Sequence, residues 1–297
     1  MSQRLPIDLS RLPVPDAVES LDYERLLIER KDLLAALAPE LAPVLQLESE
    51  PLIKLLEVEA YRELILRAEV NDSVRAVMLA SSTGADLEGL AALFGVARQI
   101  VTEADPTAVP PVAAVYEDDA SLRRRVQLAP EGLTNAGTIG SYMFHALRAH
   151  GSVRDVGISR PVPGQVLVTV LAHGADGMPA AEVLTAVTDL LEDVRPLCDD
   201  VLVAAPSFSD FDVTATLQLA EAPGAEVVRA AAETAVADYL DQARAVGRIV
   251  RRTAIIACLH REGVENVVLI SPPADVDPGL TGVARAMSVE IGTAVLP

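Results

Sequence analysis

The sequence predicts an α+β protein, in which an N-terminal helical region is followed by mixed α/β units with small, mostly antiparallel sheets. Two patterns indicate this division. As far as about residue 94, apolar residues recur at every third or fourth position, which is the period of one helix face. After about residue 115, segments that alternate apolar and polar residues are interspersed with further helical stripes. Half-polar strands are typical of antiparallel sheets with helices on one side.

The chain is expected to begin with an extended arm over residues 1–20. This segment carries Pro6, Pro13 and Pro15 and has no clean hydrophobic period. Ordering such a segment costs conformational entropy, so it is suited to docking onto a partner.

A helical domain is expected over residues 21–100. Prolines divide its first part into short pieces, and they are Pro39, Pro43 and Pro51. In the stretch from Tyr61 to Phe94, an amphipathic helix is expected to end at an Asn71-Asp72 break, before a second apolar helix. A turn rich in Ser, Thr and Gly then starts a third helix. No residue of this stretch is equipped for chemistry, so we interpret it as a helical packing and interaction module.

The segment 101–115 contains three prolines and few apolar anchors, and it is the candidate linker. Two α/β domains are expected beyond it, at 116–205 and 206–297. The first contains a strand near Val166–Leu171 that is apolar on both faces, and the second contains a half-buried strand near Asp212–Leu219.

A weak internal repeat supports two related α/β units. Each unit has a short apolar pattern that follows a helix ending near a histidine. The matching positions, offset by 111 residues, are Val153, Val156, Ile158 and Pro161 against Val264, Val267, Leu269 and Pro272. A second echo relates Ala181–Leu184 to Ala225–Val228.

The charge argues against binding of nucleic acid. The 297 residues, 51% of them hydrophobic, suffice for two or three domains, and the net charge of −19 repels phosphate. Arg123, Arg124 and Arg125 form the densest basic cluster, but Asp118 and Asp119 lie just upstream. We therefore interpret the three arginines as the exposed face of a short capped helix.

The chain shows no secretory signal and no apolar run long enough to span a bilayer, so we expect it to remain soluble in the cytoplasm and to bind no membrane. Cys198 and Cys258 are too few for a disulfide framework.

No catalytic, cofactor-binding or metal-binding residue is predicted. His145 and His150 are five residues apart and so lie on different sides of a helix, unlike a metal-binding pair. The interval from Gly132 to Gly137 matches a phosphate-binding loop, but Thr138 stands where that loop needs a lysine. A turn capped by Thr138 or Ser141 explains these residues better.

The carboxylates also favour structural roles. Asp199-Asp200 precedes a strand and is interpreted as a turn, whereas Asp275–Gly279 lacks the later glutamate of a calcium-binding loop. A hydrolase-type enzyme with a dispersed active site stays open as an alternative, and so does a binding module of another kind. An enzyme would have a concave pocket with converging titratable groups.

Three collinear motifs carry a family resemblance. The first runs from Tyr61-Arg62-Glu63-Leu64 through Asn71-Asp72 and Thr83–Leu87 to Gly95-Val96. The second runs from Asp118 to Gly132 and continues into His145-Ala146-Leu147, and the third covers Ala231–Tyr239, Gly247 and Ser271-Pro272. Together they resemble the baseplate J-like proteins of contractile-tailed bacteriophages and related injection systems. The loop Gly174–Pro179 departs from the family pattern.

The resemblance implies a structural component of the tail baseplate wedge, without catalytic residues or cofactors. It implies pairing with a second copy, assembly with other wedge proteins, and closure of six wedges into a ring around the hub, with contacts to tail fibre or hub-proximal proteins. The candidate interface or family-motif residues are Tyr61, Arg62, Asn71, Asp72, Gly84, Asp86, Phe94, Arg123, Arg124 and Arg125. We expect the Tyr61–Phe94 helices to join the wedge core and the C-terminal unit to join adjacent copies.

Overall fold

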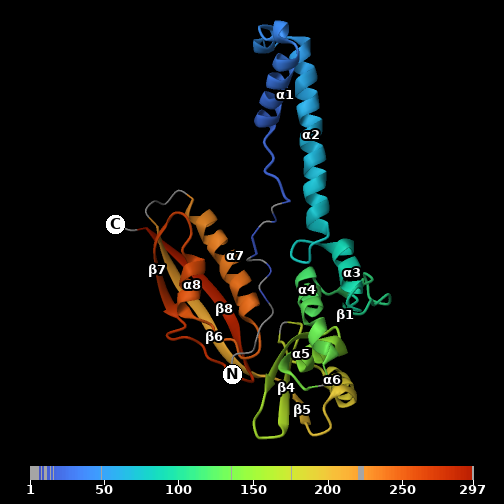
Figure 1. Ribbon diagram of the computed structural model, residues 1–297. Coiled ribbons are helices and arrows are strands. Elements are labelled where there is room, and N and C mark those ends of the chain that lie inside the picture. The colour runs from blue at the N-terminus through green and yellow to red at the C-terminus, as the bar shows by residue number, and fades with distance from the viewer. Residues whose placement is uncertain are drawn as a thin grey trace. The chain divides into compact units, whose positions relative to one another are not determined.

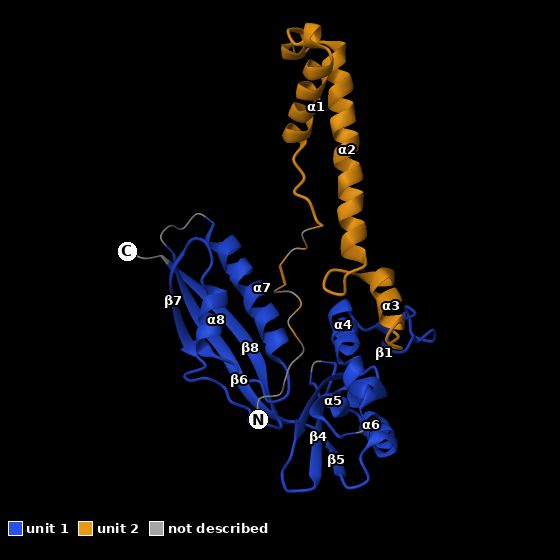
Figure 2. Cartoon of the chain, in the orientation of Figure 1, with its two compact units in different colours: residues 1–4, 98–297 blue, residues 5–97 orange. Residues whose placement is uncertain are grey.

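The computed structural model describes residues 7, 9, 12, 13, 15, 17–47, 49–134, 136–174, 176–219 and 224–295. The chain divides into two compact units, a helical unit within residues 5–97 and an α/β unit within residues 98–297 (Figure 2). Most of the arm predicted over residues 1–20 lies outside the described residues.

The helical unit is built on a hairpin of two helices, in which α1 (Tyr23–Leu37) lies alongside α2 (Pro51–Ala76) (Figure 1). Asp22 caps α1 by accepting a hydrogen bond from the backbone amide of Arg25 at 3.1 Å. The predicted proline breaks are present as two short 3₁₀ turns, η2 (Pro39–Leu41) and η3 (Val44–Gln46), and as the first residue of α2. The buried core of the hairpin consists of Leu26, Leu27 and Ala60.

The predicted helix break at Asn71-Asp72 is wrong, because α2 continues through both residues to Ala76. The Asn71 side chain is buried and forms hydrogen bonds with the backbone of Glu19, so it does not compete for the backbone of its own helix. The predicted second apolar helix is also wrong, since residues 77–81 form turns and a bend. The third helix is present as α3 (Gly84–Ala92).

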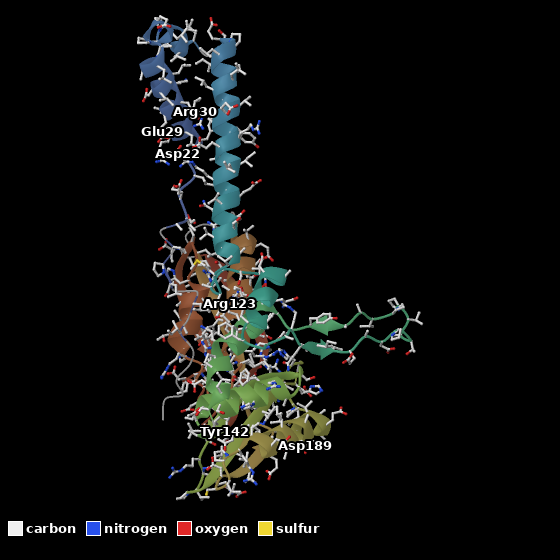
Figure 3. All side chains as sticks on the ribbon, turned by 45° about the vertical axis from the view of Figure 1, so that its right-hand side comes forward. Asp22, Glu29, Arg30, Arg123, Tyr142 and Asp189 are labelled. Atoms are coloured by element: carbon white, nitrogen blue, oxygen red, sulfur yellow. The ribbon has the colours of Figure 1, made fainter. Side chains whose placement is uncertain are left out.

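The α/β unit begins with a narrow hairpin where a linker was predicted over 101–115. Its strands are β1 (Ile100–Thr102) and β2 (Val115–Tyr116), and a bridge between Asp105 and Val112 continues the pairing. Val109 near its tip is 99% exposed, and Figure 3 shows the hairpin as an extended arm.

A first mixed sheet has the strand order β3-β4-β5, with β3 antiparallel and β5 parallel to the central β4. Helices α5 and α6 pack against each other, α5 on β3 and α6 beside β5 (Figure 1). This sheet, its helices and the preceding α4 and η4 make up the first half of the α/β unit. The elements of this half are α4 (Asp119–Leu128), η4 (Ala129–Leu133), α5 (Ile139–Ala149), β3 (Val153–Ser159), β4 (Gln165–Ala172), α6 (Ala181–Val194) and β5 (Asp200–Ala204).

A second mixed sheet has the order β7-β6-β8, with β7 antiparallel and β8 parallel to the central β6. Its core includes Val213, Leu217, Val236, Ile255 and Leu259, which join the sheet to two helices. The bounds are β6 (Ser207–Leu219), α7 (Ala225–Ala243), α8 (Arg252–Leu259), β7 (Val264–Ser271) and β8 (Gly282–Val295).

These elements confirm the predicted α+β fold class, with a parallel pair added to each three-stranded sheet. The internal repeat also has a structural counterpart. Strands β3 and β7, which carry the matching patterns, each follow a helix and form the antiparallel edge of their sheet. The boundary between residues 205 and 206 remains a prediction, since both sheets lie within one compact unit.

Candidate interaction surfaces

The outward side of α2 carries large apolar side chains that are left uncovered by the described residues of the helical unit. Their exposed fractions lie between 42% and 63%, and they are Leu55, Val58, Tyr61, Ile65, Leu66 and Val70. At 100° per residue Leu55, Val58, Ile65 and Leu66 fall on the side of α2 opposite to its buried Ile53 and Ala60, and Tyr61 and Val70 lie at the two edges of that side. A helix with apolar residues on both sides is typical of a bundle that needs a further helix.

The predicted site residues of the helical unit fall into two groups. Tyr61 and Arg62 are exposed on α2, and Phe94 is exposed just beyond α3. Gly84 and Asp86 form the first turn of α3, where Gly84 has a φ of +52°, a conformation that favours glycine. Asn71 and Asp72 serve the fold: Asn71 is buried, and Asp72 pairs with Arg75 at 3.0 Å.

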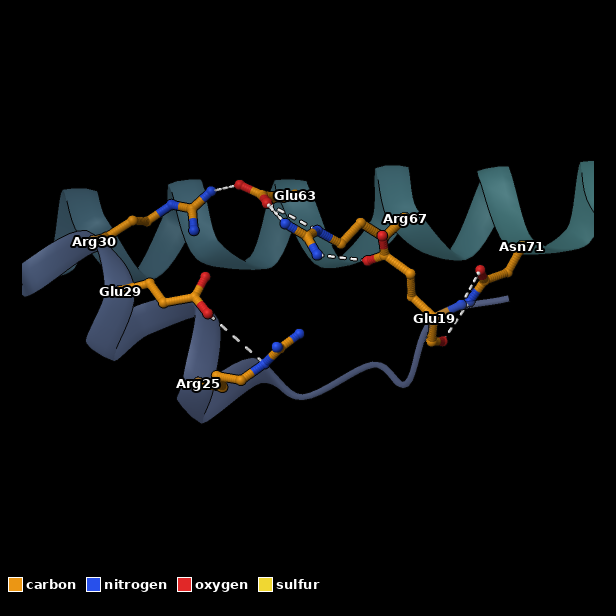
Figure 4. Close-up of polar contacts among 7 residues, drawn as sticks. All are labelled: Glu19, Arg25, Glu29, Arg30, Glu63, Arg67 and Asn71. Carbon is orange, nitrogen blue, oxygen red and sulfur yellow. Dashed lines mark hydrogen bonds and ion pairs between the residues drawn. The ribbon is translucent and has the colours of Figure 1, made fainter. Parts of the chain in front are cut away.

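An ionic network joins α1, α2 and the segment before α1 (Figure 4). Arg67 pairs with Glu63 at 2.5 Å and with Glu19 at 2.6 Å, and Arg30 pairs with the other oxygen of Glu63. Sequence analysis did not single out this network, because Glu19 is 48 residues from Arg67. It lines a groove of about 860 Å³ along α2, into which Arg62 and Glu69 also project. Arg67 is thus engaged within the fold, whereas Arg62 belongs to the outward face.

The predicted exposed basic face at Arg123–Arg125 is wrong, because Arg125 is buried and Arg123 and Arg124 are only partly exposed. The Arg125 guanidinium pairs with Glu117 at 2.6 Å, and both side chains are less than 10% exposed. Arg124 pairs with the buried carboxylate of Asp155 at 2.6 Å. Arg123, labelled in Figure 3, is partly buried like Arg124, and it donates to the Asp119 carbonyl oxygen. The acidic partners bring Arg124 and Arg125 inward: Glu117 lies just after β2, and Asp155 lies on β3.

The histidines have structural surroundings. Burial lowers the pKa of His145, whose ring meets Phe144 edge-on at 5.3 Å between centroids. Burial, and next the neighbouring Arg154, lower the pKa of His173. His150 accepts a hydrogen bond from the backbone amide of Ser152 at 3.1 Å. Among the described residues, no three His, Cys, Asp or Glu side chains gather as metal ligands would.

The remaining candidate loops also have structural roles. Thr138 accepts a hydrogen bond from the Ser141 amide at 3.2 Å and caps α5, as predicted. Asp275 accepts from the Arg252 amide at 2.9 Å and pairs with Arg251 at 2.8 Å, so it fixes the start of α8. Asp199 accepts from the Tyr142 hydroxyl at 2.7 Å, a contact that sequence analysis missed across 57 residues. Within the described part of the chain, every helix is too short or too polar to cross a membrane.

Helix α2 leaves an apolar side open, and the candidate chemical residues of the α/β unit hold the fold together. This combination is typical of a structural assembly protein. Comparison with known proteins agrees. Residues 48–105 match the Baseplate J-like N-terminal domain, residues 134–205 the Baseplate J-like central domain and residues 211–292 the Baseplate J-like protein C-terminal domain. The chain is 44% identical over 277 residues to Baseplate protein J of Escherichia phage P2, covering 91% of this chain and 92% of that protein.

The chain therefore belongs to the baseplate J-like family, which confirms the resemblance found in its sequence. Among solved structures, it is similar to a chain of the anti-feeding prophage baseplate, a 6-fold symmetrised cryo-EM structure. That similarity has a TM-score of 0.42 at 15% identity, and it covers 61% of this chain and 46% of the other.

Proposed function

We propose that this chain is a structural component of a contractile tail baseplate, which builds the wedge together with a second copy of itself and other wedge proteins. The observation that carries the proposal is the 44% identity to Baseplate protein J over 91% of the chain. Six such wedges would close into a ring around the hub, because repeated heterologous contacts generate a closed ring when the rotation between copies is suitable. The role needs no catalytic group and no cofactor.

The outward face of α2 is the surface that we assign to the wedge core. It combines exposed apolar side chains with Arg62 and Glu69, which are two helical turns apart on the same side. In an antiparallel pair of α2 helices related by a two-fold axis, Arg62 of one copy lies beside Glu69 of the other, and the reverse pair forms as well. The midpoint of this arrangement falls between Ile65 and Leu66, so the apolar residues meet at its centre.

The C-terminal half of the α/β unit is assigned to contacts between adjacent wedges. Its outermost strand β8 has 14 residues, and among the described strands it pairs with β6 alone. An unpaired strand edge is a ready site for contact with another chain. The proposed location is the tail baseplate of the virion, with assembly in the host cytoplasm.

A charge exchange on α2 tests the proposed self-association. We expect Arg62→Glu to weaken the association of two copies, measured by sedimentation equilibrium, because it places like charges beside each other in both symmetric pairs. The double variant Arg62→Glu with Glu69→Arg restores both pairs with reversed polarity, so it should associate as the unchanged protein does.

A matched control is Arg248→Glu, which carries the same change on the α/β unit. If Arg62→Glu associates like this control, or if the double variant fails to recover, the assignment of α2 to the copy–copy contact is wrong. If the chain were instead an enzyme with a dispersed active site, none of the three variants should differ from the unchanged protein in self-association.

A further inference from the structure

One face of the first sheet is covered by the second half of the α/β unit. Cross-strand pairing places Asp155 opposite Leu171 and Gly157 opposite Thr169, so these four residues share a face. Asp155, Leu171 and Thr169 are at most 6% exposed. Helices α5 and α6 pack on the other face, where Val156 lies opposite Val170. The burial of the first face therefore requires a cover from elsewhere in the chain.

That cover is Val246, which follows α7. Its backbone amide donates a hydrogen bond to Oδ2 of Asp155 at 2.8 Å, across 91 residues of sequence. Its side chain lies directly over Gly157, since a Cβ added to Gly157 would be 2.3 Å from Cγ1 of Val246. Val246 also belongs to a buried cluster with Leu171 and Val283. The valine thus occupies a socket that admits no side chain at position 157.

The carboxylate of Asp155 serves both halves of the unit at once. Its Oδ1 accepts from the Arg124 guanidinium at 2.6 Å, while its Oδ2 accepts from the Val246 amide. The Asp155 side chain is 8% exposed, and its hydrogen bond from the Val246 amide is buried, whereas Arg124 is 30% exposed. Hydrogen bonds to a charged acceptor in such a place are stronger than neutral ones.

Two further ionic contacts flank this socket. Arg154 pairs with Asp241 at 2.8 Å, joining β3 to α7. Arg285 of β8 pairs with Asp210 at 2.7 Å, stacks over the Phe208 ring at 4.4 Å, and donates to the carbonyl oxygen of Asp176 in the first half. The two halves of the α/β unit are therefore joined by the buried contact of Val246 and by two further contacts around it.

We propose that Val246 and its socket of Asp155, Gly157 and Leu171 form a clasp, which locks residues 119–204 and 207–295 into one rigid body. The inference does not depend on the baseplate role, because it concerns a contact within one chain. A machine that changes shape during contraction needs some bodies that stay rigid while others rotate. The clasp makes the whole α/β unit such a body, although it contains two separate sheets.

The test uses the full chain, deuterated and labelled for NMR. Residual dipolar couplings of amides in β4 and β6 should fit a single alignment tensor in the unchanged protein. In Gly157→Val, whose added side chain collides with Val246, the two strands should require separate tensors while each sheet keeps its own amide chemical shifts. Gly292→Ala is the matched control, since an added Cβ there meets only ordinary contacts at 3.9 Å or more.

A milder variant covers the case in which Gly157→Val fails to fold. Asp155→Asn keeps the shape of the side chain, but it cannot accept from the Val246 amide without turning its NH₂ toward Arg124. We expect the exchange rate of the Val246 amide hydrogen to rise at least about tenfold, with the exchange of amides in the centres of β4 and β6 unchanged. Separate tensors in the unchanged protein, or a Val246 exchange rate that Asp155→Asn leaves unaltered, would overturn the clasp.

Discussion

The Asn71 side chain forms a reciprocal pair of hydrogen bonds with the backbone of Glu19. Its Oδ1 accepts from the Glu19 amide at 3.0 Å, and its Nδ2 donates to the Glu19 carbonyl oxygen at 2.9 Å. Asn71 thereby holds the segment before α1 against α2 in the way that a strand partner would. This use of the side chain explains why an asparagine is buried within a continuous helix.

Replacing Asn71 with alanine should therefore destabilise the helical unit. Two backbone groups of Glu19 lose their partners. Because Glu19 is exposed and water can replace these partners, the loss is about 0.5–1.5 kcal/mol of unfolding free energy per hydrogen bond. Urea unfolding followed by circular dichroism measures the loss. Asp72→Ala is the control, because the Asp72 side chain is 75% exposed and its ion pair contributes little. Equal stability of the two variants would contradict the structural role of Asn71.

A second prediction concerns the buried pair of Glu117 and Arg125. Glu117→Gln removes the charge that compensates the Arg125 guanidinium, and breaking a buried pair costs about 3–5 kcal/mol. Glu117 also accepts from the Gln99 amide at 2.9 Å, so the base of the hairpin should loosen as well. Chemical unfolding should show the loss, whereas the exposed Glu265→Gln on β7 should change stability by less than about 0.5 kcal/mol.

The buried histidines predict a loss of stability in mild acid. Burial holds the pKa of His145 and His173 below the ordinary value of about 6.5, so below that pH the unfolded chain binds more protons than the folded one. Stability should be fully present above about pH 6.5 and should fall as the pH drops toward the folded pKa values.

The contribution of one histidine can be isolated by substitution. Urea unfolding of His145→Gln at pH 7.5 and 5.5 should show a smaller difference in stability than the unchanged protein. His260→Gln provides the comparison, because His260 is exposed. A His145 variant with an undiminished difference would show that its burial does not govern the acid response.

Sequence reasoning succeeded where the determining residues are close together in the chain. The positions of Pro39 and Pro51, the cap at Thr138 and the period of β6 all depend on a few neighbouring residues, and the structure contains each of them. The strand near Val166–Leu171 was also correctly predicted to be apolar on both faces, although only the structure shows that Val246 covers one of them.

Several of the errors concern polar residues whose partners carry no signal in the local sequence pattern. Asn71 was interpreted as a helix break because Glu19 is 52 residues distant. Arg124 and Arg125 were interpreted as exposed because their spacing to Asp155 and Glu117 carries no local signal. Composition and periodicity indicate which residues are apolar, but they do not specify which buried charged residues form ion pairs with each other.

The central claim is that the outward apolar face of α2 binds other wedge proteins. The most direct test of this claim is to measure the mass of the complexes that the chain forms. Light scattering would compare the chain alone with the chain co-expressed with its neighbouring tail proteins. We expect a complex of fixed ratio, which is lost when Tyr61 and Ile65 are both changed to glutamate. The complex should be kept when Val227 of α7, which is even more exposed, is changed to glutamate. A monomer that ignores every tail partner, or a complex that survives the α2 change, would contradict the account.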